Sequence, residues 1–470
     1  MAGLLDQVYL RSPYWLQRLF MNVEALRVER HRYGARFRSA LEDMRTRDRW
    51  SRERIEAFQL KRLRTILGQA YEGSPWYREA MDHAGLRPSD VRTLADLRGL
   101  PILTKERVRA EGEALLTSPT APPGALHGHT SGTTGSPLSL WYDRRACVVN
   151  NAADARQKLW AGKAPWDWIG LFLGRVVVPT GRARPPFWQV NYVQKQVWFS
   201  SFHMTPANLE RYVGEVERRG LRYLEGYPST LYILARHLVR SGRTLPVEAV
   251  FSSSETLHPV QRETIEETFE SPLFDFYGQA ERVIFAMECE EHEGKHLAED
   301  YGITEVVDEH GEPVPDGEVG YLTGTSLHNT YMPMIRYRTS DLSAIVPEPC
   351  ACGRTFRRIR SVTTKAEDIV VTPDGRWISP SVLTHPFKPF DQLVESQIIQ
   401  EAPDRIRIKL VPSASFGEEH EERLLAGIRE RVGEGIDLEV EVVEAIPREP
   451  SGKFRWVISK VESDVQSSWT

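Results

Sequence analysis

The pattern of apolar and polar residues divides the central part of the chain into short strands that alternate with helices. From Leu209 onward, apolar runs such as Val247–Phe251 and Leu273–Phe276 are separated by helical patterns such as Pro259–Phe269. Strands that alternate with helices in this way form largely parallel sheets with helices on both faces. Residues 1–116 also have helical spacing. The sequence therefore predicts an α/β fold with mostly parallel sheets.

A change in this pattern near residue 362 predicts a second, smaller domain. Residues 303–346 are expected to be antiparallel, with a turn at Pro315-Asp316-Gly317. Beyond them, strands and a helix are expected at Ile369–Thr372, Trp377–Ser379, Val394–Gln400, Ile406–Val411, Glu418–Val432 and Leu438–Val443. We therefore expect a large N-terminal domain over residues 1–362 and a small C-terminal α+β domain over residues 363–470, which is a usual domain size.

The composition excludes several classes of partner. The 470 residues are 41% hydrophobic and 27% charged, which is typical of a globular protein with more than one core. A net charge of −5 gives no basic footprint for nucleic acid. No apolar run approaches the roughly 20 residues that a membrane span needs, and the N-terminal residues lack the pattern of a signal peptide. Four cysteines, two of them separated by one residue, indicate reduced thiols rather than a disulfide framework. The expected location is the cytoplasm.

Two groups of residues have both a functional and a structural interpretation. Arg30, Arg32, Arg36 and Arg38 could form a basic face for lipid or RNA, but the acidic residues nearby favour ordinary solvated helices. Aromatic residues are frequent over residues 160–202, where they could line a pocket for an apolar or aromatic substrate. We expect most of these rings to lie in the core.

The stretch His129–Pro137, HTSGTTGSP, has a composition that no hydrophobic core requires. Seven of its nine residues are Thr, Ser or Gly. Glycines let the backbone pass close to a ligand, so that amides and hydroxyls can surround an anion. The stretch lacks the Gly-Lys-Ser/Thr ending of a Walker loop. The alternative interpretation is a polar linker. Linkers are seldom followed directly by a strand, whereas this stretch leads directly into the strand-like run Leu138–Tyr142. The stretch is predicted to bind the phosphates of a nucleotide.

Three more polar segments follow predicted strands directly. They are Gly226-Tyr227-Pro228-Ser229, Ser252-Ser253-Ser254-Glu255 and Tyr277-Gly278-Gln279-Ala280-Glu281. Ligands of open parallel sheets bind beyond the carboxyl ends of the strands. The three segments are therefore expected to lie together at one edge of the sheet, around a bound ligand.

The order of these motifs resembles that of the adenylate-forming superfamily over nearly the whole chain. The motifs are TSGTTGSP, SSSETL, FYGQAE, YRTSD and, near the C-terminus, PSGK. Each motif alone is weakly specific, whereas five in this order and spacing are a strong signal. The closest branch is that of phenylacetate–CoA ligases and CapK-like proteins, and the SSSETL form and the DGRWISP hairpin are most similar to the CapK-like members.

The resemblance implies a role for each matching residue. Thr130, Ser131, Gly132, Thr133, Thr134 and Gly135 would bind the β- and γ-phosphates of ATP. Tyr277 would stack on adenine, beside Gly278 and the backbone near Ser254 and Glu255. Glu281 would hold Mg²⁺, and Asp341 would accept both ribose hydroxyls. Lys453 would reach from the small domain to the α-phosphate, where its charge stabilises the transition state. The catalytic residues implied are Lys453, Glu281 and Thr134.

Two positions depart from the pattern of the superfamily. Ser136 stands where the phosphate loop often carries a lysine, and the hinge, usually Gly-Arg-x-Asp-Asp, is Thr364-Lys365-Ala366-Glu367-Asp368. In the superfamily, rotation of the small domain about this hinge separates adenylation from the thiol-using half-reaction. Loss of the glycine stiffens such a rotation, so the resemblance supports the first half-reaction better than the second.

The segment 289–352 contains the residues of a candidate metal site. Two thiolates that bracket one residue, Cys350 and Cys352, can complete a tetrahedral zinc site with a distant Cys/His pair. Cys289 and His296 are the favoured pair, and His292 is the reserve ligand. Some members of the family show the same pattern with a structural zinc. The alternative is ordinary buried cysteines with surface histidines. Cys147 is left over, and we expect it to act as a small buried hydrophobic residue.

The resemblance implies an enzyme, which is an ATP-dependent ligase of the acid–CoA type. It would activate a carboxylic acid as an acyl-adenylate, release pyrophosphate, and transfer the acyl group to CoA with release of AMP. An amine or hydroxyl acceptor, giving an amide or ester, is the first alternative, and a non-catalytic family member is the second. The cofactors implied are ATP, Mg²⁺, structural Zn²⁺ and CoA. Related ligases are often homodimers, which is the expectation for assembly.

Overall fold

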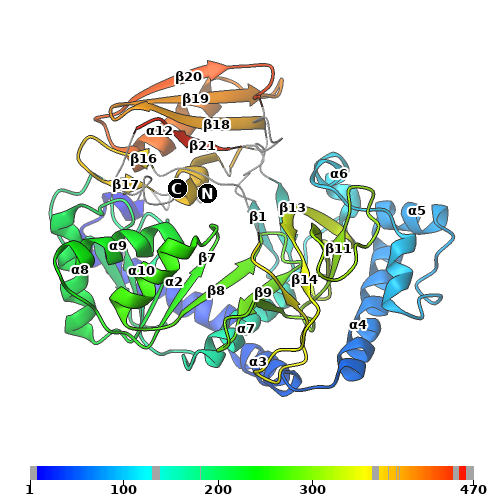
Figure 1. Ribbon diagram of the computed structural model, residues 1–470. Helices are drawn as coiled ribbons and strands as arrows, with labels where there is room; N and C mark the ends of the chain where they lie inside the picture. The colour runs from blue at the N-terminus through cyan, green and yellow to red at the C-terminus, as the bar shows by residue number, and fades with distance from the viewer. Residues whose placement is uncertain are drawn as a thin grey trace.

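The structure is a computed structural model, and it describes residues 8–129, 138–179, 181–362, 370–378, 380–387, 389–390, 392–447 and 455–461. A ten-stranded sheet runs through the middle of the molecule (Figure 1). In spatial order its strands are β14 (Ile345–Val346), β15 (Arg358–Ile359), β10 (Lys295–Leu297), β9 (Phe285–Glu288), β8 (Leu273–Gly278), β7 (Ala249–Ser253), β6 (Tyr223–Gly226), β3 (Ile169–Phe172), β5 (Gln196–Phe199) and β4 (Trp188–Asn191).

The centre of this sheet is parallel, as the alternating pattern predicts. The strands β5, β3, β6, β7 and β8 pair in parallel, and the strands outside them are antiparallel. The connecting helices are α8 (Pro206–Arg219), α9 (Pro228–Arg240) and α10 (Pro259–Phe269). Each has a proline in its first turn, where the ring fits the helical backbone and no amide is lost. Buried Val250 and Leu224 pack against α8 and α9, so this face of the sheet is fully covered.

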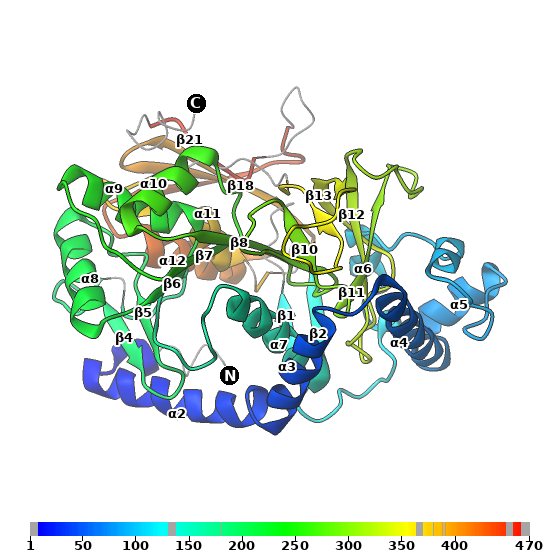
Figure 2. The ribbon, with the colours of Figure 1, turned by 60° about the horizontal axis from the view of Figure 1, so that its bottom comes forward.

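The other face of the sheet is covered by α7 (Arg144–Trp160) and by the N-terminal helix α3 (Ala35–Arg47) (Figure 2). The helix α7 begins at Arg144 because the Asp143 side chain caps it and accepts from the Ala146 amide at 2.7 Å. The N-terminal helices are α2 (Tyr14–Arg32), α3 (Ala35–Arg47), α4 (Arg52–Gly73), α5 (Pro75–His83), η1 (Leu94–Gly99), α6 (Lys105–Glu111) and η2 (Gly112–Leu115). Within the described residues, no helix combines the length and apolar character that crossing a membrane requires.

Two smaller antiparallel units stand beside the main sheet. The strands β11 (Gly302–Val307), β12 (Gly320–Ser326) and β13 (Tyr337–Ser343) form a three-stranded sheet, as expected for this region. The helices α4 and α5 lie beside this smaller sheet (Figure 2). The strands β1 (Leu126–His129) and β2 (Ser139–Tyr142) pair on either side of the predicted phosphate loop. The Tyr142 hydroxyl donates to the carbonyl of Ala280 at 2.6 Å, so this hairpin is fixed next to the turn that follows β8.

The C-terminal part forms its own sheet and core. The strands β20 (Asp437–Val442), β19 (Arg405–Pro412), β18 (Leu393–Ala402) and β21 (Val457–Ser459) are adjacent in this order. The other elements are α11 (Pro380–Thr384), η3 (His385–Phe387), α12 (Glu418–Val432) and the hairpin of β16 (Val370–Val371) with β17 (Trp377–Ile378). Phe202 and Tyr227 of the preceding part pack into this core. These elements confirm an α/β fold followed by a smaller α+β unit. The predicted boundary at residue 362 lies next to residues 363–369, which are outside the described residues.

Candidate active site and metal centre

Several predicted site residues fall outside the described part of the chain. They are Thr130, Ser131, Gly132, Thr133, Thr134, Gly135 and Ser136 of the phosphate loop, Thr364–Asp368 of the hinge, and Lys453. Their roles stay predictions. The described flanks do constrain the loop, because β1 ends at His129 and β2 begins at Ser139. A side chain at Gly128 would lie 2.9 Å from the Tyr142 ring, so the first strand requires glycine there.

The three polar segments after β6, β7 and β8 lie at one edge of the sheet. The register pairs Gly226 with Ser252, and Ser253 with Phe276, so the three strands end side by side. The Glu255 carboxylate accepts from the Ser229 amide at 3.1 Å and joins two of the segments. Ser254 has φ of +70°, in the left-handed region that a non-glycine residue rarely adopts. This edge is therefore a tightly held set of turns, as expected for a ligand-binding edge of a parallel sheet.

Two tyrosine–carboxylate contacts connect this edge to β13. The Tyr277 hydroxyl, at the end of β8, donates to the Asp341 carboxylate at 2.8 Å, and the Tyr337 hydroxyl donates to Glu281 at 2.7 Å. Burial, followed by the neighbouring carboxylates, raises the pKa of both tyrosines well above the ordinary value. Both hydroxyls therefore keep their protons and hold the carboxylates in place. Residues predicted to meet adenine, ribose and Mg²⁺ thus lie in one small region, although they come from separate segments.

Tyr337 was not among the residues that the sequence identified as a site residue. It lies inside the YRTSD motif, four residues before Asp341, so the motif itself was the available signal. Its neighbour Arg336 fixes the start of β13. The Arg336 guanidinium pairs with Glu305 at 3.1 Å and donates to the carbonyl of Leu100 at 2.8 Å. These contacts set the position of the strand that carries Tyr337 and Asp341.

The four predicted metal ligands are brought together. The ligand atoms of Cys289, His296, Cys350 and Cys352 all lie within 4.8 Å of one another. The Sγ atoms of Cys289 and Cys350 are 3.6 Å apart, and Cys352 Sγ is 3.3 Å from His296 Nε2. Cys289 follows β9 directly and His296 lies on β10, whereas the other two cysteines lie between β14 and β15. Antiparallel pairing of these short strands therefore closes the cluster.

The orientation of His296 suits metal binding. Its Nδ1 lies 2.9 Å from the carbonyl oxygen of Phe356. A carbonyl can only accept, so Nδ1 carries the proton and Nε2 offers a lone pair to the cluster. Burial lowers the pKa of His296 to about 4, which keeps the ring neutral.

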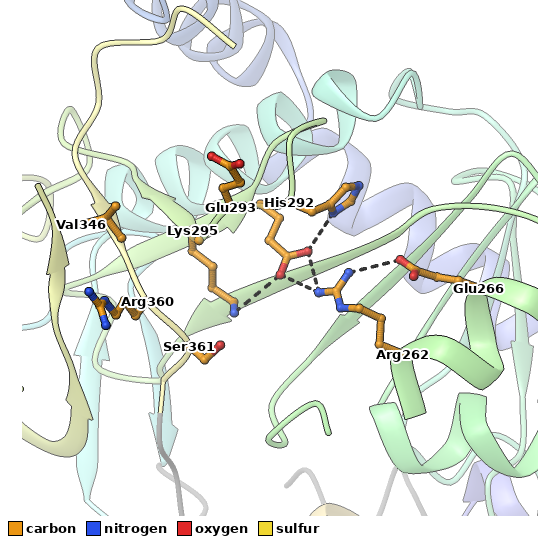
Figure 3. A pocket seen from close by; sticks show the side chains of 10 residues that line it. Arg262, Glu266, His292, Glu293, Lys295, Val346, Arg360 and Ser361 are labelled. Carbon is orange, nitrogen blue, oxygen red and sulfur yellow. Dashed lines mark hydrogen bonds and ion pairs between the residues drawn. The ribbon is translucent and has the colours of Figure 1, made fainter. Parts of the chain in front are cut away.

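The reserve ligand His292 lies outside this cluster, in a neighbouring cavity of about 540 Å³ (Figure 3). Its Nδ1 is 3.1 Å from the Glu288 carboxylate, and its ring packs on Phe274. The same carboxylate accepts from Arg262 at 2.6 Å. Lys295 lies opposite and pairs with Asp275 at 3.0 Å. His292 therefore belongs to the network of ion pairs around Glu288 and not to the Cys/His cluster.

The sequence favoured a structural interpretation, rather than a functional one, for Cys147 and for most aromatic residues between 160 and 202. Cys147 is buried and its sulfur accepts from Arg282 at 3.3 Å, which confirms that this cysteine is a packed side chain. All four phenylalanines between residues 160 and 202 are buried in the core, whereas the five tryptophans of this stretch are only partly buried. The expectation that most of the rings lie in the core therefore holds for the phenylalanines alone. These are Phe172, Phe187, Phe199 and Phe202, whereas Tyr192 is half exposed.

Comparisons with known proteins agree with this architecture. The CapK C-terminal domain family matches residues 370–460. Phenylacetate–coenzyme A ligase of Escherichia coli is 30% identical over 354 residues, which cover 73% of this chain and 78% of the relative. Protein CapK of Staphylococcus aureus is 23% identical over 479 residues, 98% of this chain and 100% of the relative.

Solved structures show the same fold. A 2-hydroxyisobutyryl-CoA ligase, in complex with 2-HIB-AMP and CoA, matches with a TM-score of 0.58 and 23% identity, over 88% of this chain and 92% of that chain. These matches confirm the resemblance on which the site residues were assigned. The chain belongs to the phenylacetate–CoA ligase family of adenylate-forming ligases, with a C-terminal domain of the CapK type.

Proposed function

We propose that this chain activates a carboxylic acid with ATP and transfers the acyl group to CoA. The observation that carries the proposal is the meeting of Tyr277, Asp341 and Glu281 at the carboxyl edge of the parallel strands. Activation is chemically required because a carboxylate is a poor electrophile and hydroxide a poor leaving group. AMP leaves readily, so an acyl-adenylate can react with a thiol.

Each half-reaction is a substitution. In the first, the carboxylate oxygen forms a bond to the α-phosphorus of ATP and pyrophosphate leaves. Asp341, an acceptor-only group, would hold the ribose hydroxyls, and Glu281 offers the hard oxygen ligand that Mg²⁺ prefers. Bound Mg²⁺ would neutralise charge on the phosphates. In the second half-reaction, the CoA sulfur forms a bond to the acyl carbon and AMP leaves.

The proposal also assigns a structural zinc ion to the Cys/His cluster. Tetrahedral bonds of about 2.3 Å to sulfur and about 2.0 Å to nitrogen place neighbouring ligand atoms roughly 3.5–3.8 Å apart. The observed separations are 3.6 Å between two sulfur atoms and 3.3 Å between sulfur and nitrogen. The donor set of three thiols and one imidazole suits zinc. Four protein ligands leave no open position, so zinc would stabilise the junction of β9, β10 and the Cys350–Cys352 loop rather than act on substrate.

The first experiment is ATP–pyrophosphate exchange with a panel of aryl, fatty, hydroxy and amino acids, without any acceptor. Exchange that depends on one class of acid supports adenylation and identifies the substrate class. Addition of CoA, an amine or an alcohol to that acid then identifies the acceptor from the product. Absence of exchange with every acid, in enzyme that still binds ATP, would favour the non-catalytic alternative.

Lys453→Ala tests the catalytic assignment in the C-terminal domain. We expect exchange to fall on the order of 10²- to 10³-fold, because a preorganised charge at the α-phosphate is lost. Lys460→Ala is the matched control, since Lys460 is exposed and pairs with Glu401. Unchanged exchange in Lys453→Ala would refute the role of this lysine.

A second candidate function has the same first half-reaction with an amine or hydroxyl as the acceptor. The hinge Thr364–Asp368, which lacks the usual glycine, favours it. A homodimer remains the proposed assembly, and light scattering of the purified protein tests it.

A further inference from the structure

The helix α2 is held rigidly on the outside of the molecule, beside the edge strand β4 (Figure 2). On its inner side, the Tyr14 hydroxyl donates to the carbonyl of Trp188 at 2.6 Å, and the Asn22 amide donates to that of Val190 at 2.9 Å. Ala25 is buried on the same side. These contacts fix the rotation of the helix about its axis, so its outer side is a defined surface.

Four large apolar side chains form a row on this outer side. Trp15, Leu19, Val23 and Leu26 are between 51% and 67% exposed. Their spacing of four, four and three residues places them on one side of a helix. Tyr192, also half exposed, is attached next to the row because its amide donates to the Asn22 side chain at 2.8 Å. Single exposed apolar residues are ordinary, but a continuous row of this length marks a docking surface.

The same segment is strongly basic in an acidic protein. Residues 8–38 contain seven arginines and two glutamates, a net charge of +5, whereas the whole chain has −5. Arg30 is exposed and continues the apolar row one turn beyond Leu26. The Arg27 side chain is 73% exposed and has only a loose ion pair, at 3.6 Å, with Glu24. Cationic groups therefore border the apolar row, and the acidic residues that favoured a purely solvated helix do not neutralise this face.

We propose that α2 docks on the surface of an anionic lipid bilayer, with its axis parallel to the membrane. The row from Trp15 to Leu26 would enter the boundary between headgroups and acyl chains, and the arginines would contact lipid phosphates. An anionic bilayer offers an apolar layer for the row of large side chains and negatively charged phosphates for the arginines. A second copy is disfavoured, because a two-fold axis would place two α2 helices, each of net positive charge, against each other. The proposal involves no membrane span and is independent of the ligase reaction.

Co-sedimentation of the full chain with vesicles tests this proposal. Vesicles of phosphatidylcholine alone are compared with vesicles that contain phosphatidylglycerol, at low and high salt. We expect binding only to the anionic vesicles, and weaker binding at high salt because the charges are screened. Trp15→Ser/Leu19→Ser should reduce the partition coefficient at least about tenfold. Arg27→Gln/Arg30→Gln should reduce it on the order of 30-fold, from about 1 kcal/mol for each charge.

Matched variants test whether the loss of exposed apolar area or of arginine charge elsewhere on the protein has the same effect on vesicle binding. Val319→Ser/Val442→Ser removes equally exposed apolar side chains from other elements, and Arg87→Gln/Arg218→Gln removes exposed arginines elsewhere. Both should bind like the wild type. Circular dichroism shows whether each variant is folded. Absence of binding to anionic vesicles, or binding that Trp15→Ser/Leu19→Ser leaves unchanged, would overturn the proposal. The proposal would also be overturned if light scattering shows a dimer that Trp15→Ser/Leu19→Ser dissociates, because a second copy of the chain would then cover the apolar row.

Discussion

Hydroxyl groups of two buried tyrosines hold the two carboxylates that the site depends on. The two contacts restrict the rotamers of Asp341 and Glu281, which are proposed to bind ribose and Mg²⁺. Neither tyrosine can release its proton near neutral pH, because burial raises both pKa values well above the ordinary range. The contacts therefore act as fixed donors over the whole working range of pH.

Tyr337→Phe removes one of these donors without changing the shape of the ring. We expect ATP–pyrophosphate exchange to fall about 10- to 100-fold, since a hydrogen bond to a charged group contributes about 1.5–3 kcal/mol. The Mg²⁺ concentration that gives half-maximal exchange should rise, because the lost hydrogen bond is the one to Glu281, the proposed Mg²⁺ ligand. Tyr192→Phe, on an exposed loop, is the control. A loss of exchange with unchanged Mg²⁺ dependence would indicate a structural effect only.

A pH dependence of stability is expected from His328. Burial, followed by repulsion from Arg62, lowers the pKa of His328 to about 3, against an ordinary value near 6.5. Its Nε2 donates to the Asp300 carbonyl at 3.0 Å. Between about pH 6.5 and 3, the unfolded chain takes up a proton here that the folded chain does not. Stability from this residue is therefore complete above about pH 6.5 and is lost as the pH falls toward 3.

His328→Gln keeps a donor at this position but cannot take up a proton. The free energy of unfolding, measured by denaturant titration from pH 7 to pH 4, should fall less steeply in this variant than in the wild type. His310→Gln is the control, because the His310 side chain is 77% exposed. Parallel curves for the wild type and His328→Gln would contradict the assignment.

At the scale of elements, the short strands β9, β10 and β15 surround the Cys/His cluster, for which we propose a structural zinc ion. Strands of two to four residues pair weakly by themselves, and the loop with Cys350 and Cys352 has little regular structure. A metal ion that binds only the folded chain stabilises it by the free energy of binding. The proposed zinc ion would therefore compensate for the shortness of the strands.

Cys350→Ser should remove zinc from the purified protein and lower its melting temperature by at least about 5 °C. Elemental analysis measures the metal, and calorimetry measures the transition. Cys147→Ser, at the fourth cysteine, should keep its zinc. Zinc in a one-to-one ratio in Cys350→Ser would exclude this cysteine as a ligand.

At the scale of the molecule, the resemblance to the superfamily implies that the small domain would change its position relative to the large one between the two proposed half-reactions. Phe202 and Tyr227 belong to the large part but are buried in the core of the small one. The Arg376 side chain also donates to the Phe202 carbonyl at 3.0 Å. These contacts oppose rotation of the small domain away from the observed arrangement. The absence of the usual hinge glycine would oppose this rotation further.

Thr364→Gly restores the residue type usual at the first hinge position. If rotation limits the second half-reaction, product formation with CoA should become about threefold faster or more, with ATP–pyrophosphate exchange unchanged. Both rates are measured on the same preparation, so exchange serves as the internal control. An equal change in both rates would exclude a specific effect on rotation.

The sequence by itself determined the parallel sheet, the metal ligands as a set of candidates, and the family. These depend on local pattern and on residue order, which a single chain displays directly. The N-cap of α6 is an example of such a local contact, since the Thr104 side chain accepts from the amide of Arg107, three residues later in the chain. The family followed from five short motifs in a fixed order, and the CapK and phenylacetate–CoA ligase matches confirm it.

Only the tertiary structure decided which residues touch. Tyr337 and Glu281 are 56 positions apart, and nothing local indicates that their side chains meet. The choice of His296 over His292 depends on the antiparallel register of β9 and β10 and on the competing bond to Glu288. The apolar row on α2 resembles an ordinary core face in the sequence. Its exposure follows from Tyr14 and Asn22, which turn the other side of the helix toward β4.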